Sequence, residues 1–159
     1  MKRTLCAAAL MLGVVFAAPA FAVEQAFPVN ANISGEAPVT LAPELVHQIG
    51  EVEISTSIFV MGSEQHKVRG ILLRDLMKHL GTKAENAKIA ALDGYTMDVP
   101  TEDFLKYDVV LATEIDGQKL SVRDKGPAWI IYPASKHPEL QDTVYEARSV
   151  WQVKSIEFN

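Results

Sequence analysis

The sequence of 159 residues contains a single cysteine, Cys6. One thiol cannot form an intramolecular disulfide, a cysteine-rich zinc site or an iron–sulfur cluster, so these are excluded. The chain also has no excess of basic residues, since its formal charge is −5. A protein that binds nucleic acid needs a basic surface to neutralise phosphates, so we expect no nucleic-acid partner.

The common catalytic signatures are absent as well. The sequence has no Gly-x-Ser-x-Gly elbow, no glycine-rich phosphate loop followed by Lys-Ser/Thr, and no His-Glu-x-x-His motif. Its four histidines are far apart, with no partner at helical i, i+4 spacing, and a metal site needs convergent ligands. The four histidines are His47, His66, His79 and His137. The missing motifs argue against a hydrolase or a nucleotidase, and the spacing of the histidines argues against a histidine-rich metal site.

Residues 1–22 have the pattern of a secretory signal peptide. Two basic residues precede an apolar run from Leu5 to Phe16, and Ala20-Phe21-Ala22 provides small residues for cleavage after Ala22. The run is shorter than the ~20 residues of a spanning helix, which argues against a membrane anchor. We therefore expect an exported mature chain, residues 23–159, without cysteine and without membrane insertion.

The mature chain is acidic. Removal of Lys2 and Arg3 leaves 13 basic against 20 acidic residues and a formal charge of −7. An exported protein without disulfides fits the periplasm of a Gram-negative bacterium. No repeat or Gly/Ser linker divides residues 23–159, so we predict one domain.

Hydrophobic patterning predicts an α+β fold: a mixed sheet or partial barrel with short helices. We expect a polar loop over 61–67 and a central strand, buried on both faces, over 128–132. Helices are expected over 43–49 and 71–80, after Thr101, and as a turn within 140–146. Further strands are expected over 29–34, 51–60, 88–92, 95–99, 109–115, 119–122 and 150–158.

Two segments concentrate side chains suited to binding. Arg123, Asp124 and Lys125 precede Gly126-Pro127 and the buried strand, where a rigid turn would hold backbone donors and cations. An ordinary turn ahead of a core strand is the alternative there. In the second segment Arg148 and Trp151, with Ser149 between them, offer a guanidinium fork and a flat ring. A tryptophan at the start of a strand is more often a core residue than a platform for a ligand, and this is the alternative for Trp151.

Five motifs carry a family resemblance. In order and spacing they resemble the molybdopterin-binding domain of the sulfite oxidase family over about residues 33–158. The resemblance implies that family's α+β fold and a pterin pocket at the ends of its strands. The motifs are GILLRDL (70–76), GYTMDVP (94–100), LAT with DGQKL (111–120), GP with IIYP (126–133) and SVWQVKSI (149–156).

The sequence departs from the family pattern at the residue that binds the metal. Enzymes of this type hold molybdenum through a cysteine thiolate in the strand and loop after the first helix. The corresponding stretch here, Ser55 to Ser63, reads STSIFVMGS and contains no sulfur ligand of that kind. The resemblance therefore implies a pterin pocket without the metal's anchor, and argues against an enzyme.

Small exported proteins of this type resemble periplasmic pterin-binding partners of membrane-bound enzymes that make or degrade cyclic di-GMP. We expect a non-catalytic sensor that binds a pterin, such as a tetrahydropterin or a folate-type ring, and contacts the periplasmic domain of a membrane signalling protein. The alternatives are a molybdopterin-dependent oxidoreductase, or a subunit of one, and an interaction scaffold.

The expected pterin site combines ring-stacking and polar residues. The ring would stack on Trp151 or Tyr95, with Ser149 close by. Its aminopyrimidinone edge presents donors and acceptors side by side, which suits Asp93, Asp124 or Arg148. An anionic substituent would instead be held by a group of cations, namely Arg69, Arg123 and Lys125.

Overall fold

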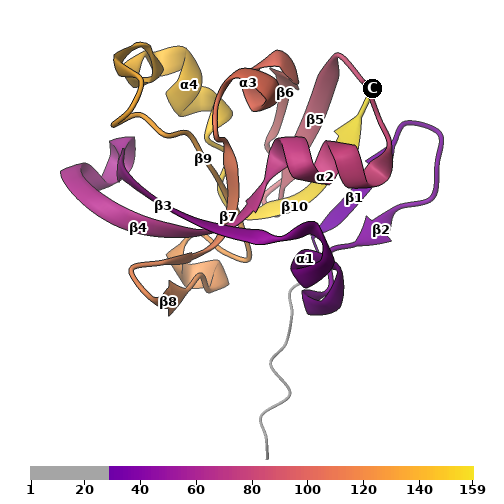
Figure 1. Ribbon diagram of the computed structural model, residues 1–159, viewed down its shortest axis with the longest axis horizontal. Coiled ribbons are helices and arrows are strands. Elements are labelled where there is room, and N and C mark those ends of the chain that lie inside the picture. The colour runs from indigo at the N-terminus through magenta and orange to yellow at the C-terminus, as the bar shows by residue number, and fades with distance from the viewer. Residues whose placement is uncertain (1–28) are drawn as a thin grey trace, which may run out of the picture.

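The computed structural model describes residues 29–159, so the predicted signal peptide lies outside the described residues. Two sheets with short helices form the domain (Figure 1), which confirms the α+β prediction. In the first sheet the order is β2-β1-β10-β5-β6. Strand β1 runs parallel to β10, and the other pairs are antiparallel. The bounds are β1 Asn30–Ile33, β2 Val39–Thr40, β5 Asn86–Ala91, β6 Thr96–Pro100 and β10 Val153–Phe158.

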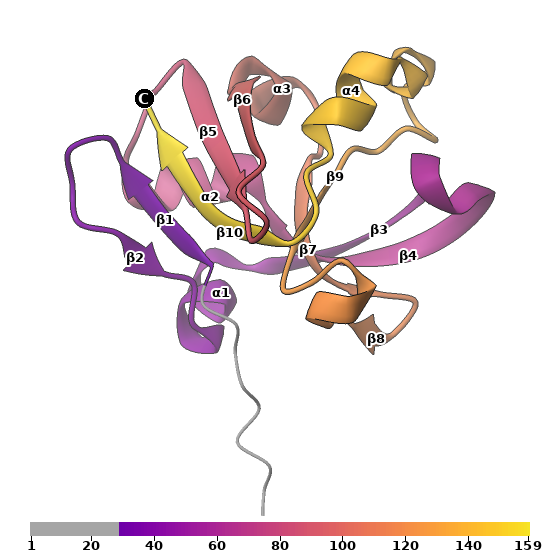
Figure 2. The same cartoon turned by 180° about the vertical axis from the view of Figure 1, so that it is seen from behind.

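The second sheet is antiparallel, with the order β3-β4-β7-β8 and β9 paired to β7. Strands β3 and β4 make a long hairpin that projects from the body of the domain (Figures 1 and 2). The bounds are β3 Glu51–Ile58, β4 Gly62–Leu72, β7 Val110–Ile115, β8 Gln118–Lys119 and β9 Trp129–Ile131.

Within residues 29–159, four α-helices and three short 3₁₀ helices connect the strands. The helix α2 begins directly after β4 and ends at Gly81, whose left-handed φ of 71° lets its N–H reach the last carbonyls of the helix. No helix among residues 29–159 is long and apolar enough to cross a membrane. The bounds are α1 Pro43–Ile49, α2 Leu73–Leu80, α3 Glu102–Lys106, α4 Thr143–Arg148, η1 Phe59–Met61, η2 Val122–Asp124 and η3 Pro138–Gln141.

Strand β7 separates two apolar clusters. Leu111 packs with the cluster that includes Phe104 and Phe158, whereas Val110 and Ala112 pack with the cluster around Trp129. Since successive side chains of a strand point to opposite faces, β7 and β9 are buried on both sides. This confirms the predicted burial of residues 128–132.

Two sequence predictions were wrong in detail. Residues 62–67 belong to β4 and not to a loop. His66 of β4 pairs with Thr56 of β3, and because both side chains are polar, the sequence shows no alternation of polar and apolar residues there. The strand β9 is not central, because its only ladder is with β7. The segment from Val150 to the start of β10 covers the other edge of β9. Ile130 N donates to Val150 O, and Val153 N donates to Ala128 O, both at 2.9 Å.

Candidate functional site

A groove of about 350 Å³ lies between the β5–β6 turn and the end of α4. Two half-exposed aromatic rings line it: Tyr95 from the turn, 45% exposed, and Trp151 from the α4–β10 connection, 41% exposed. The two rings line one concave surface together with polar groups, which is the usual composition of a small-molecule site. The remaining lining residues are Ala91, Asp93, Thr143, Glu146, Ala147, Ser149 and Val150.

The β5–β6 turn fixes one wall of the groove. Gly94 adopts a φ of 90°, which a glycine accommodates without strain. The Asp93 carboxylate accepts a hydrogen bond from Tyr95 N at 2.9 Å, and the Tyr95 hydroxyl donates to Ala147 O at 3.5 Å. The turn is therefore joined to α4, the opposite wall.

The second wall is α4 and the residues that follow it. Asp142 caps the helix by accepting from Val144 N at 3.0 Å. After the helix, Ser149 Oγ donates to Tyr145 O at 2.8 Å. The Gln152 side chain donates to Val122 O at 2.7 Å, and this bond ties the connection to η2.

Trp151 rests edge-on against a second, buried indole. The ring centroids of Trp129 and Trp151 are 6.3 Å apart at 88°, and Trp129 Nε1 donates to Ser149 O at 3.0 Å. Lys125 Nζ lies 4.5 Å from the centroid of the Trp151 ring. Trp129 is thus the core tryptophan, and the alternative that placed Trp151 in the core is wrong.

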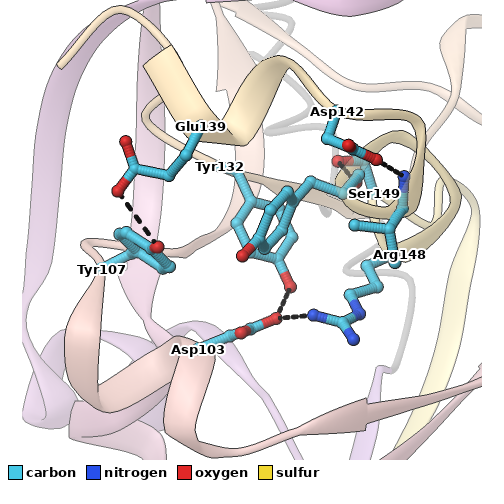
Figure 3. Close-up of polar contacts among 9 residues, drawn as sticks. Asp103, Tyr107, Tyr132, Glu139, Asp142, Arg148 and Ser149 are labelled. Atoms are coloured by element: carbon cyan, nitrogen blue, oxygen red, sulfur yellow. Dashed lines mark hydrogen bonds and ion pairs between the residues drawn. The ribbon is translucent and has the colours of Figure 1, made fainter. Parts of the chain in front are cut away.

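Arg148 is held by a buried carboxylate of α3, Asp103. Its Nη1 donates to Asp103 Oδ2 at 2.8 Å, and the Tyr132 hydroxyl donates to the same oxygen at 2.9 Å (Figure 3). Burial, and then the negative charge of Asp103, raises the pKa of Tyr132 far above its usual value, so the hydroxyl stays a donor. Arg148 anchors α4 to α3 and does not line the groove.

The other predicted polar residues lie elsewhere. Arg69 pairs with Glu51 across β3 and β4 at 2.9 Å. Asp124 accepts from Ser121 Oγ at 2.6 Å within the η2 turn, beside the exposed Arg123. None of Arg69, Arg123 and Asp124 lines the groove, whereas Asp93, Tyr95, Ser149 and Trp151 do.

Sequence reasoning missed two kinds of residue. Thr143, Glu146 and Ala147 line the groove from one face of α4, and their i, i+3, i+4 spacing is the signal that could have shown this. Asp103 is only 8% exposed, and no local pattern indicates its pairing with Arg148, 45 positions further along the chain.

Comparison with known proteins agrees with this architecture. The family model described as "Oxidoreductase molybdopterin binding domain" matches residues 51–138. The chain belongs to this family. The match confirms the resemblance drawn from the five motifs, but it ends before α4. Six of the nine residues that line the groove therefore lie outside the matched range.

Among solved structures, the fold is similar to the sulfane dehydrogenase SoxCD from Paracoccus pantotrophus, with a TM-score of 0.61 and 15% identity. The comparison covers 83% of this chain and 38% of the SoxCD chain. A search of curated protein sequences found no match.

The stretch where the family resemblance led us to expect a molybdenum anchor, residues 55–63, contains hydroxyls and no thiolate. Ser135 Oγ accepts from Ser57 N and from Gln65 Nε2, both at 2.7 Å, and Thr56 lies buried beside it. Residues 29–159 contain no cysteine and no cluster of three His, Asp or Glu able to hold a metal ion. These donors do not fit a thiolate-anchored molybdenum centre.

Proposed function

We propose that this protein is a non-catalytic, exported pterin-binding protein that reports pterin availability to a membrane-bound enzyme making or degrading cyclic di-GMP. The groove beside Trp151 supports pterin binding most directly. It combines two exposed rings with polar groups in about 350 Å³, within the range of small-molecule sites. Membership of a molybdopterin-binding family supports the ligand class.

In this proposal the pterin ring stacks against Trp151 or Tyr95. The donors of its aminopyrimidinone edge pair with a carboxylate of the groove, Asp93 or Glu146, and Ser149 adds a hydroxyl. Arg148 acts indirectly, because its bond to Asp103 fixes the end of α4 from which Ser149 and Trp151 project.

The relay to a signalling enzyme rests on other support. The signal-peptide pattern of residues 1–22 would take the chain to the periplasm, where pterin and a membrane protein's periplasmic domain can both reach it. Since Trp151 and the connection after α4 are partly exposed, a partner could contact the same elements that contact the ligand.

The family match also favours a second candidate, a molybdopterin-dependent oxidoreductase or a subunit of one. The hydroxyl donors at residues 55–63 oppose it, and no step of our proposal involves molybdenum.

Two measurements on one preparation separate these functions. Protein purified from a host grown with molybdate is assayed for metal and titrated with oxidised and reduced pterins while tryptophan fluorescence is recorded. We expect substoichiometric molybdenum and saturable quenching by a pterin. Stoichiometric molybdenum would overturn the sensor proposal. If no pterin changes the tryptophan fluorescence, the scaffold alternative is left.

A further inference from the structure

The charges that line the groove are of one sign. Asp93 enters from the β5–β6 turn and Glu146 from α4, and no Lys, Arg or His side chain lines the groove with them. Two carboxylates on one concave surface repel an anionic ligand group and attract hydrogen-bond donors.

Two cations contact elements next to the groove without lining it. Arg148 is paired with Asp103 of α3 at 2.8 Å. Lys125 lies against the two indoles, 4.5 Å from the Trp151 centroid and 5.2 Å from the Trp129 centroid, and does not line the groove. Neither side chain lines the groove, so the charged groups on its wall are Asp93 and Glu146.

From this charge distribution we infer that the groove selects flat heterocycles that present donors and carry no anionic substituent. Resting on the proposed pterin site, the inference narrows the ligand class to unphosphorylated pterins and excludes pterin phosphates. The expected seat for an anionic substituent, formed by Arg69, Arg123 and Lys125, is not assembled at this groove.

The test compares two ligands with the same ring. Neopterin and neopterin monophosphate are titrated into the protein by calorimetry at low salt. We expect neopterin to bind about tenfold tighter or more, because repulsion of a phosphate by two nearby carboxylates is on this order. The preference should shrink as salt is added, since salt screens partly exposed charges.

Charge-neutralising variants assign the effect to the two carboxylates. Asp93→Asn keeps an acceptor for Tyr95 N and suits the turn, so the fold should persist. Combined with Glu146→Gln, it should reduce the discrimination to about threefold or less, by removing the repulsion. The matched control is Asp98→Asn, an exposed carboxylate on β6 outside the groove, which should leave the discrimination unchanged.

The outcomes separate the two proposals. If both ligands bind equally, or the phosphate binds tighter, the charge inference is wrong and the pterin site stands. If discrimination persists in the double variant, the two carboxylates are not its source and the inference is wrong. Should neither ligand nor any other pterin bind, both proposals fall together.

Discussion

Arg148 Nη1 lies 2.8 Å from Asp103 Oδ2, and this ion pair joins the last turn of α4 to α3 across 45 residues of sequence. The Arg148 side chain is 21% exposed and that of Asp103 is 10% exposed, so both charges are largely removed from water. If Arg148 is removed, Asp103 remains as a buried charge without its ion-pair partner.

Arg148→Ala should therefore destabilise the protein. The expected loss in the free energy of unfolding is about 2–4 kcal/mol, somewhat below the range for fully buried pairs because Arg148 keeps some exposure. Urea unfolding followed by circular dichroism measures it. Arg69→Ala removes an exposed ion pair with Glu51 and should change stability little. Equal stability of Arg148→Ala and the parent would contradict the anchoring role.

The same network predicts a loss of stability at alkaline pH. Because the pKa of Tyr132 is raised in the folded state by burial and by Asp103, its contribution is complete below the unfolded pKa of about 10 and is lost as pH rises above it. Between pH 9 and about 11, melting temperatures of the parent should fall more steeply than those of Tyr132→Phe. Parallel slopes would show that the pKa of Tyr132 is the same in the folded and unfolded states.

Gly70 is required where β4 meets β7. A Cβ atom there would collide with the backbone of Leu111 and Ala112, which cannot withdraw as a flexible side chain can. Gly70→Ala should cost about 3 kcal/mol by overpacking, measured by urea unfolding. A variant as stable as the parent would show that the two strands separate more easily than this contact implies.

Trp151→Ala should abolish or strongly weaken pterin binding while the fold persists. Stacking of a flat ring on an aromatic side chain contributes about 1–3 kcal/mol, so the dissociation constant should rise about tenfold or more. The matched control is Leu105→Ala, which truncates an exposed apolar side chain on α3 that lies outside the groove. Calorimetry measures the affinity, and unchanged affinity in Trp151→Ala would place the ligand elsewhere.

The strands and helices with clear patterns were predictable from sequence. Local spacing predicts the row of apolar side chains on α2 and the buried strand around Ile130. Turn chemistry predicts the Asp93-Gly94 turn between β5 and β6. The tip half of β4 was not, because its side chains are polar on both faces and show no alternation.

The site was predictable only in part, because some of its contacts join segments that are far apart in the sequence. Trp151, Ser149, Tyr95 and Asp93 stood out by residue type, and the fold brings them to one groove. The pairing of Arg148 with Asp103 depends on how α3 and α4 pack, and this is a long-range relationship without a local signal.

The central claim, a pterin in the groove beside Trp151, is tested most directly by NMR of isotope-labelled protein titrated with a reduced pterin. We predict saturable shifts of the Trp151 indole N–H and of the Tyr95 and Ser149 amides, with little change in α1 and β2. The absence of shifts, or shifts confined to the far end of the domain, would contradict the account.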